Sequence, residues 1–187
     1  MVILEDTKLK EAADVIRAGG VIAYPTEAVY GLGCDPFNRA AVEKICRLKQ
    51  RSVDQGVLLI ASNFMQVESL IAPLATVVLQ RALATWPGPY TWVFPCSEQV
   101  PAWIRGKYPS VGLRVTNHPI AAELCGRFGG AIVSTSANKH GAAPSKKASD
   151  VIAEFASEID ALIDGTVGEL EQPTPIRDVL TNAVIRS

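Results

Sequence analysis

The chain reads Ala131-Ile132-Val133-Ser134-Thr135-Ser136-Ala137-Asn138 where a short apolar run passes directly into three hydroxyl side chains and an amide. The run 131–133 is typical of a buried strand. Because the ligand crevice of an α/β fold usually opens where such a strand ends, the polar group at 134–138 is a candidate for binding phosphate or sugar. A hydrogen-bonded turn that caps its own backbone explains the same residues equally well, so both interpretations stay open.

Segments with strand and helix patterns alternate on both sides of this stretch. Apolar runs of strand length lie at 21–24, 57–61, 90–94, 111–115, 131–133, 161–163 and 183–185. Helical spacing of apolar residues marks 7–18, 38–49, 63–86, 119–129 and 149–155. We expect a loop at 25–33, and Pro73 suits the first turn of a helix.

The order of these segments predicts the fold class. Helices separate the first strands, but the strands after Pro87 are joined by segments too short for a crossover helix. We therefore expect an α/β protein with a mixed parallel and antiparallel sheet flanked by helices. No repeat or low-complexity linker marks a second domain, so residues 1–187 are predicted to form one domain.

Composition argues against several classes of protein. The 18 Lys and Arg against 19 Asp and Glu give a formal charge of −1, so the totals carry no polyanion-binding signature, although a local basic cleft is compatible with them. Four dispersed cysteines without C-x-x-C argue against a structural zinc site, and we predict no metal ligands in the chain. We expect His118 at the start of a helix and His140 in a loop.

The N-terminal residues carry charges where a signal peptide needs an apolar stretch. No window approaches the roughly 20 apolar residues of a membrane span. We therefore predict a reduced, cytoplasmic setting without a membrane partner.

Known nucleotide-binding loops do not occur in the sequence. Gly31-x-Gly33 follows a strand, but Pro36 occupies the position where a dinucleotide-binding turn has its third glycine. The sequence also has no G-x-x-x-x-G-K-[ST] loop. If the protein uses ATP, its phosphate contacts must come from other groups.

Lys49 and Arg51 lie two residues apart just beyond a predicted helix. If the chain is extended there, both side chains point to the same side and can converge on one anion. An ammonium and a guanidinium together suit phosphate oxygens on which negative charge builds. The alternative is that Arg47, Lys49 and Arg51 only complement the negative end of the helix dipole in solvent.

Arg114 lies between Leu113 and Val115 in a predicted strand, so its side chain points away from the face of these two residues. An isolated arginine in such a strand often binds a carboxylate. Equally often its stem covers an exposed face of the sheet, and the position alone does not separate the two interpretations.

Five short motifs together resemble the YrdC family in order and spacing. They are Pro25-Thr26-Glu27, Lys49-Gln50-Arg51, Trp86-Pro87-Gly88-Pro89-Tyr90-Thr91, Leu113-Arg114-Val115 and Ser134-Thr135-Ser136-Ala137-Asn138. The match runs from about Val21 to Asp178, and the pairing of K-x-R with S-x-N is its most specific part. The chain resembles the short form of the family rather than the longer Sua-type relative with an extra C-terminal domain.

This resemblance implies a twisted sheet that lines a deep basic pocket, and a nucleotidyltransferase activity. The implied reaction joins L-threonine, bicarbonate or CO2 and ATP, with Mg2+, into threonylcarbamoyl-AMP and pyrophosphate. This is the first step toward the t6A modification of tRNAs that read ANN codons. The implied partners are therefore tRNA and the proteins that transfer the threonylcarbamoyl group.

The resemblance also assigns roles to individual residues. Lys49 and Arg51 are carried over as the catalytic residues. The implied ATP-binding set is Lys49, Arg51, Ser134, Ser136 and Asn138. The implied threonine-binding set is Thr26, Arg114 and Thr174, with Arg114 a natural partner for the amino-acid carboxylate.

Three positions depart from the family pattern. Ser52 stands where proline is usual, and Gln55 stands where lysine is common, which lowers the positive charge at the pocket mouth. Pro175 follows Thr174 where a serine–threonine pair is common, and it removes a backbone donor.

Two other functions remain open. One is a non-catalytic module that binds double-stranded RNA or tRNA in RNA maturation or translation, against which the net charge and the missing aromatic–basic motif count. The other is carbamoyl-adenylate chemistry of the hydrogenase-maturation type, which is disfavoured because it requires zinc-finger cysteines and further domains that this sequence lacks.

Overall fold

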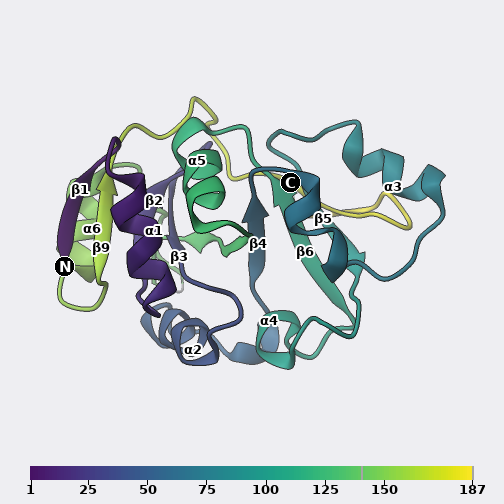
Figure 1. The fold of residues 1–187 in the computed structure, drawn as a ribbon, viewed down its shortest axis with the longest axis horizontal. Coiled ribbons are helices and arrows are strands. Elements are labelled where there is room, and N and C mark those ends of the chain that lie inside the picture. The colour runs from purple at the N-terminus through teal and green to yellow at the C-terminus, as the bar shows by residue number, and fades with distance from the viewer. Residues whose placement is uncertain (140, 187) are drawn as a thin grey trace.

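The computed structural model describes residues 1–139 and 141–186, and its strands form two hydrogen-bonded sheets with helices packed around them (Figure 1). The α/β class and the mixture of parallel and antiparallel pairing are confirmed. The hydrogen bonds divide the strands between two sheets, where one sheet was expected. His140, expected in a loop, lies outside the described residues.

The first sheet has the order β1-β9-β2-β3-β8. Its strands are β1 (Val2–Glu5), β9 (Ala161–Asp164), β2 (Ile22–Pro25), β3 (Tyr30–Gly33) and β8 (Thr135–Ser136). The first three pair in parallel, whereas β3 is antiparallel to both β2 and β8. The hydroxyl-rich stretch of the sequence therefore forms one edge of this sheet.

The second sheet has the order β11-β10-β5-β6-β4-β7. Its strands are β11 (Val184–Arg186), β10 (Ile176–Asp178), β5 (Thr91–Pro95), β6 (Ser110–Val115), β4 (Leu58–Ala61) and β7 (Ile132–Val133). Strands β10 with β5, and β4 with β6, pair in parallel, and the other neighbours are antiparallel. Because β7 and β8 are consecutive, residues 132–136 pass from one sheet to the other.

The described residues form six α-helices that cover the sheets, and several of their ends follow the expected capping rules. They are α1 (Leu9–Arg17), α2 (Arg39–Leu48), α3 (Thr76–Leu83), α4 (Ala102–Arg105), α5 (Pro119–Phe128) and α6 (Ala148–Phe155). Asn38 caps α2 by accepting a hydrogen bond of 3.1 Å from the Ala41 N–H. Gly129 ends α5 with a left-handed φ of 88°. His118 caps the start of α5, as expected.

Two groups of buried apolar residues hold these layers together. The smaller group joins α1, through Leu9 and Ile16, to Leu124 of α5 and Ile163 of β9. The larger group lies between α2 and the central strands of both sheets. Each fully buried leucine or isoleucine stabilises the fold by about 1.5–3 kcal/mol, so the apolar runs of the sequence become the strands that frame the site.

Several segments differ from the sequence prediction. Residues 64–66 and 68–70 form single 3₁₀ turns, and the helix that follows begins only at Thr76, so Pro73 precedes the helix instead of lying in its first turn. Strands β1, β3, β8 and β10 and the short helix α4 were not predicted. Strand β3 was missed because it contains glycines, which weaken the sequence pattern of a strand. Glycine is required at position 33 because a Cβ there would lie 2.8 Å from the Val133 carbonyl oxygen.

Among the helices of the described chain, none combines the length and the apolar character needed to cross a membrane.

Candidate active site

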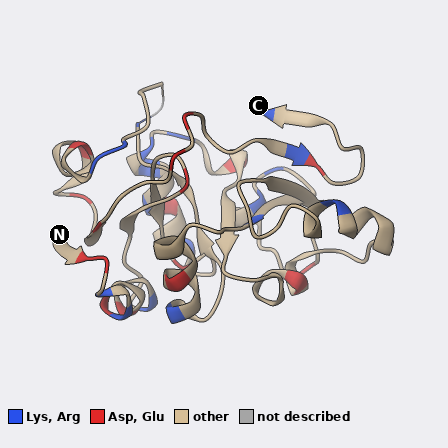
Figure 2. Ribbon diagram, turned by 90° about the horizontal axis from the view of Figure 1, so that it is seen from above, with Lys and Arg blue, Asp and Glu red and all other residues tan. Residues whose placement is uncertain are grey.

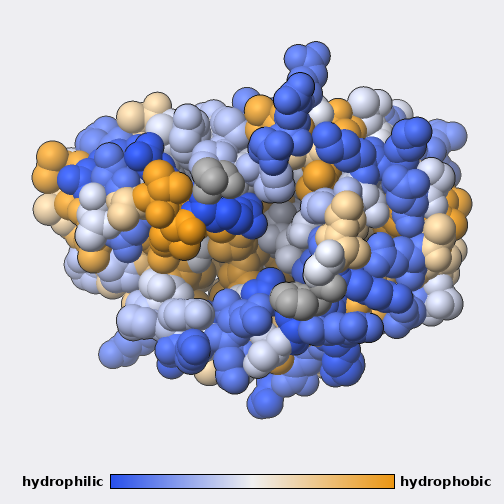
Figure 3. Space-filling model, turned by 180° about the vertical axis from the view of Figure 1, so that it is seen from behind, coloured by the Kyte–Doolittle hydropathy of each residue, from blue (hydrophilic) through white to orange (hydrophobic). Residues whose placement is uncertain are grey.

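A hollow of about 320 Å³ opens where strands of the two sheets meet. The face of the molecule in Figure 3 is hollowed near its middle, with hydrophilic residues around much of the opening. Polar residues that line the hollow are Thr26, Lys49, Arg51, Gln55, Thr91, Arg114, Ser134, Thr135, Ser136, Asn138, Thr174 and Arg186. All eight residues of the predicted ATP-binding and threonine-binding sets are therefore brought together.

Charged residues are spread along the whole ribbon, and several basic ones come together near its middle (Figure 2). Four cations contribute to the hollow: Lys49, Arg51, Arg114 and Arg186. A chain with almost balanced totals thus contains a local basic site, which its net charge did not reveal.

The C-terminal end of α2 positions Lys49 and Arg51. The Gln50 N–H bonds to the Arg47 carbonyl and the Arg51 N–H to the Cys46 carbonyl, each at 3.0 Å, which is a Schellman ending. Gln50 has a φ of 53°, in the left-handed region that favours glycine. The expectation of an extended chain here is therefore wrong: a helix ending turns both cations into the hollow.

The ammonium of Lys49 contacts the hydroxyl-rich stretch. Lys49 Nζ donates to the Ser136 carbonyl oxygen and, at 2.8 Å, to the Asn138 carbonyl oxygen, and it lies 3.2 Å from Asn138 Oδ1. Only 5% of Lys49 is exposed. Burial, and then the neighbouring Arg51 charge, lower the pKa of Lys49 to about 8. The alternative of a solvated helix end is wrong for this residue.

Arg51 is half-buried and lines the hollow together with Lys49. Its Nη2 donates to the Gly56 carbonyl oxygen at 2.5 Å, and burial lowers the pKa of its guanidinium. Its Nε is buried, with no hydrogen-bond partner in the described part of the chain. Donors remain on this side chain for an anion.

The backbone of the Ser134–Asn138 stretch is bonded to neighbouring strands. The Ser134 N–H donates to the Leu58 carbonyl oxygen and the Ala137 N–H to the Tyr30 carbonyl oxygen, both at 2.8 Å. The Asn138 side-chain amide donates 2.7 Å to the Ala142 carbonyl oxygen. Strand pairing satisfies the backbone N–H groups of Ser134 and Ala137, whereas Asn138 bonds to its own local backbone, as the turn alternative predicts. Ser134 and Ser136 line the hollow.

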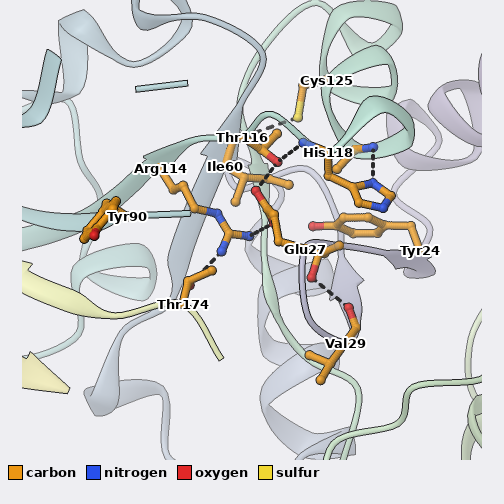
Figure 4. Close-up of polar contacts among 12 residues, drawn as sticks. Tyr24, Glu27, Val29, Ile60, Tyr90, Arg114, Thr116, His118, Cys125 and Thr174 are labelled. Atoms are coloured by element: carbon orange, nitrogen blue, oxygen red, sulfur yellow. Dashed lines mark hydrogen bonds and ion pairs between the residues drawn. The ribbon is translucent and has the colours of Figure 1, made fainter. Parts of the chain in front are cut away.

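Arg114 is the centre of a buried network at the other end (Figure 4). It is 6% exposed, which excludes the alternative of a stem covering an exposed sheet face. Its Nη1 donates to Thr174 Oγ1 at 2.7 Å, and its Nη2 lies 3.2 Å from Glu27 Oε2. Because the Thr174 oxygen accepts from Arg114, the Thr174 hydroxyl hydrogen is available to a ligand.

Thr26 and the segment before β10 complete this end. Thr26 Oγ1 donates to the Val29 carbonyl oxygen at 2.7 Å, so the hydroxyl oxygen is the part of this side chain that can still accept a bond. Pro175, the departure beside Thr174, has no N–H, but its carbonyl oxygen accepts from the Thr91 N–H at 3.0 Å. Thr174 itself remains in the hollow.

The other two departures are explained by local geometry. Ser52 caps a short 3₁₀ turn by accepting 3.1 Å from the Asp54 N–H. Gln55 lines the hollow, where its neutral side chain adds no charge.

Three residues of the site were missed by the sequence reasoning. Glu27 lies in a quoted motif but received no role. Thr91 lines the hollow from β5. Arg186, in the last described strand, donates from Nη2 to the Thr174 carbonyl oxygen at 2.9 Å, and burial lowers its pKa. Arg186 lies beyond the five motifs quoted from the sequence, so none of them indicated it.

The residues around the hollow do not fit a protein-built Mg2+ site. Magnesium in proteins is held by one or two carboxylates with substrate phosphates and water. Residues 1–139 and 141–186 contain no group of three or more His, Cys, Asp and Glu side chains able to hold a metal. Glu27, which forms an ion pair with a cation of the hollow, is already engaged by Arg114.

The arrangement can hold a polyanion at one end and a carboxylate at the other. Lys49, Arg51 and the Ser134–Asn138 stretch supply cations and hydroxyls suited to phosphate oxygens. Arg114 and Thr174 present a guanidinium and a hydroxyl suited to a carboxylate. A small acid and a nucleotide would then lie next to each other in the hollow.

Comparison with known proteins gives consistent matches. The family model Sua5_yciO_yrdC, described as "Telomere recombination", matches residues 14–187. A protein of Coxiella burnetii named threonylcarbamoyl-AMP synthase is 47% identical over 178 residues, which cover 95% of this chain and 96% of that relative.

Two solved structures share the fold. The crystal structure of P. abyssi Sua5 complexed with L-threonine has a TM-score of 0.91 and 31% identity over 98% of this chain, which spans only 56% of that protein. The crystal structure of E. coli YciO has a TM-score of 0.83 and 26% identity, over 100% of this chain and 94% of the other.

Proposed function

Because the chain belongs to the Sua5, YciO and YrdC family, we propose that it is a nucleotidyltransferase that joins L-threonine, bicarbonate or CO2 and ATP into threonylcarbamoyl-AMP and pyrophosphate. The relative that carries this name matches almost its whole length at 47% identity. One observation on this chain carries the proposal: a single hollow holds cations for phosphates at one end and a buried arginine for a carboxylate at the other. P. abyssi Sua5 was crystallised with L-threonine, which supports the amino-acid end.

The division of labour follows from the side chains. Lys49 and Arg51 are the catalytic residues and hold the phosphates of ATP. Ser134, Ser136 and Asn138 complete the nucleotide end with hydroxyls and an amide. Thr26, Arg114 and Thr174 bind threonine, and Arg114 with Thr174 holds its carboxylate.

The reaction has two bond-forming steps. The neutral amine of threonine attacks the carbon of CO2, and the amine proton lost in this step leaves to solvent, which gives a carbamate. A carbamate oxygen then attacks the α-phosphorus of ATP in line, and the bond between the α-phosphorus and its bridging oxygen breaks to release pyrophosphate. Negative charge builds on the phosphate oxygens, so Lys49 and Arg51 stabilise the transition state by position and charge.

Four further parts of the proposal concern the context of the reaction. Mg2+ would enter on the phosphates of ATP, because the described residues offer it no site of their own. The whole chain, residues 1–187, is one domain. A cytoplasmic location is supported by the free thiols of all four cysteines. The product passes to the proteins that build t6A on tRNAs reading ANN codons.

Pyrophosphate release tests the proposal. Purified protein should release pyrophosphate from ATP only when L-threonine, bicarbonate and Mg2+ are all present, and mass spectrometry should detect threonylcarbamoyl-AMP. Equal release with L-serine, or no release with any amino acid, contradicts the proposed reaction. Tight, strongly salt-dependent binding of tRNA without consumption of ATP would favour an RNA-binding module instead.

A further inference from the structure

The two ends of the hollow differ in the charges that surround their cations. Within residues 1–139 and 141–186, no carboxylate forms an ion pair with Lys49, Arg51 or Arg186. Arg114, in contrast, pairs with Glu27 at 3.2 Å, and both residues are buried, at 6% and 5% exposure. Lys49 and Arg51 at the phosphate end therefore carry unpaired charges, whereas Glu27 balances the charge of Arg114. Arg186, which donates to the Thr174 carbonyl oxygen, leaves one positive charge at the amino-acid end.

The network behind Arg114 keeps Glu27 as an acceptor. The His118 N–H donates to Thr116 Oγ1 at 3.1 Å, so the Thr116 hydroxyl hydrogen is free to donate, at 2.6 Å, to Glu27 Oε1. Arg114 reaches Glu27 from the other side. A hydroxyl hydrogen and a guanidinium therefore approach the Glu27 carboxylate from two sides (Figure 4).

The backbone of Glu27 is also fixed. Its carbonyl oxygen accepts from the Leu170 N–H at 3.2 Å, and Gly168 approaches so closely that a Cβ there would lie 2.5 Å from the same oxygen. Glu27 is not among the residues that line the hollow. Any effect of Glu27 on a ligand must therefore act through Arg114.

The contact between Glu27 and Arg114 balances charge more than it orients the guanidinium. Glu27 Oε2 is close to Arg114 Nη2 but accepts no aligned hydrogen bond, whereas the bond from Nη1 to Thr174 Oγ1 is aligned, at 2.7 Å. The attraction of a buried cation grows with the charge of the anion. Without Glu27, Arg114 would attract a multivalent phosphate more strongly than a carboxylate.

We propose that Glu27 is a specificity-determining residue that acts through Arg114: by balancing the Arg114 charge, it lets this end take the single negative charge of threonine and reject pyrophosphate and the phosphates of ATP. The inference rests on the proposed function, because it takes the Arg114 end as the amino-acid end. The inference assigns one kind of anion to each end: the monovalent carboxylate binds Arg114, and the multivalent phosphates bind Lys49 and Arg51.

Calorimetric competition tests this inference without turnover. L-Threonine is titrated into the protein at increasing pyrophosphate, for the wild type and for Glu27→Gln. The threonine Kd of the wild type should not depend on pyrophosphate. In Glu27→Gln the apparent Kd for threonine should rise with the pyrophosphate concentration, by about tenfold at the highest concentration used. The reason is that pyrophosphate can now compete for Arg114. Glu123→Gln, which removes an exposed carboxylate paired with Arg127, is the charge-matched control and should behave as the wild type.

Each outcome decides the matter. Competition already present in the wild type, or absent from Glu27→Gln, overturns the inference. An equal loss of threonine and pyrophosphate binding in Glu27→Gln would mean that Glu27 only supports the structure, and also overturns it. If Glu27→Gln fails to fold, Glu27→Asp draws the carboxylate back by one methylene, and weaker competition of the same kind is expected. A wild type that binds ATP but no threonine would overturn the proposed function, and this inference with it.

Discussion

The ammonium of Lys49 lies 2.8 Å from the carbonyl oxygen of Asn138, so the end of α2 is bonded to the stretch that follows β8. The cation therefore links two sides of the hollow, and under the proposed function it also holds phosphate. Replacing it with the similarly sized Lys49→Met removes the charge and keeps most of the volume. Turnover should fall by at least about 100-fold, because charge stabilisation of the transition state is lost.

The same variant should remain folded. Removing a desolvated ammonium offsets the lost hydrogen bonds, and water in the hollow can reach the freed carbonyl oxygens, so the Tm should change by less than about 4 °C. Pyrophosphate release and a thermal melt measure the two effects. A large drop in Tm alongside the lost activity would instead make Lys49 a structural residue.

The lowered pKa of Lys49 predicts a pH dependence. In the free enzyme Lys49 loses its proton as the pH rises through about 8, well below the ordinary value for lysine. Since kcat/KM for ATP reports the enzyme before ATP binds, kcat/KM for ATP at low, fixed threonine should fall above pH 8. The free energy of unfolding should change in the opposite direction. Between pH 8 and 10.5 the folded state binds fewer protons at Lys49 than the unfolded chain does, so the free energy of unfolding increases as the pH rises across that window.

Lys49→Arg provides the control for this profile. An arginine stays charged over the whole range, so the fall in kcat/KM above pH 8 should disappear in a variant that retains activity. An unchanged fall in Lys49→Arg would assign it to another group.

Much of the fold follows from local sequence signals. The apolar runs at 57–61 and 111–115 became the parallel neighbours β4 and β6, and Asn38 and Gly129 mark the ends of α2 and α5 as their residue types predict. The strands that escaped prediction depend on distant partners. β3 contains two glycines and β8 has only two residues, so neither carries a local pattern, and each is held by the other.

The site could be predicted wherever one short motif carries the chemistry. Lys49, Arg51 and Ser134 to Asn138 belong to such motifs. Glu27 and Arg186 do not reveal their roles in sequence, because their partners Arg114 and Thr174 are brought to them only by the sheet. The geometry at Gln50 was also hidden, since a left-handed conformation at a glutamine has no local signal.

Gln50 provides a test of how the helix ending positions the cations. Its φ of 53° is tolerated by glycine but strained for a β-branched side chain. Gln50→Gly should keep kcat/KM for ATP within about twofold and not lower the stability, because the left-handed strain of about 1 kcal/mol is relieved. Gln50→Val should lower both the stability, by about 1–2 kcal/mol, and kcat/KM for ATP. Denaturant melts and initial rates decide, and equal activity of the two variants would contradict the positioning role.

A substitution at Thr174 tests which substrate binds at which end of the hollow. Thr174→Val keeps the shape of the side chain but removes the oxygen that accepts from Arg114 Nη1. The KM for L-threonine should rise about tenfold, since an aligned bond to a charged group is lost, while the KM for ATP stays within about twofold. Steady-state kinetics with each substrate varied in turn measures the split. A larger effect on ATP than on threonine would reverse the proposed assignment of the ends.

Gly168 tests whether the backbone behind Glu27 must be held in place. A Cβ at Gly168 would lie 2.5 Å from the Glu27 carbonyl oxygen and 3.0 Å from its Cα, and these backbone atoms cannot turn away as a side chain could. Gly168→Ala should therefore destabilise the protein by about 1–3 kcal/mol. It should also weaken threonine binding, because Thr26 and Glu27 are displaced together: the Thr26 carbonyl oxygen accepts from the Gly168 N–H at 2.9 Å.

Gly126 is the matched control for this substitution. It lies on the exposed side of α5, and a Cβ added there would have no atom within 4 Å other than those of its chain neighbours and of the helix's own backbone. Gly126→Ala should therefore stabilise the helix by about 0.5–1 kcal/mol and leave threonine binding unchanged. Denaturant unfolding and threonine calorimetry on both variants measure the contrast. If Gly168→Ala were as stable as Gly126→Ala, or bound threonine normally, the close approach at Glu27 would not be what holds the amino-acid end in place.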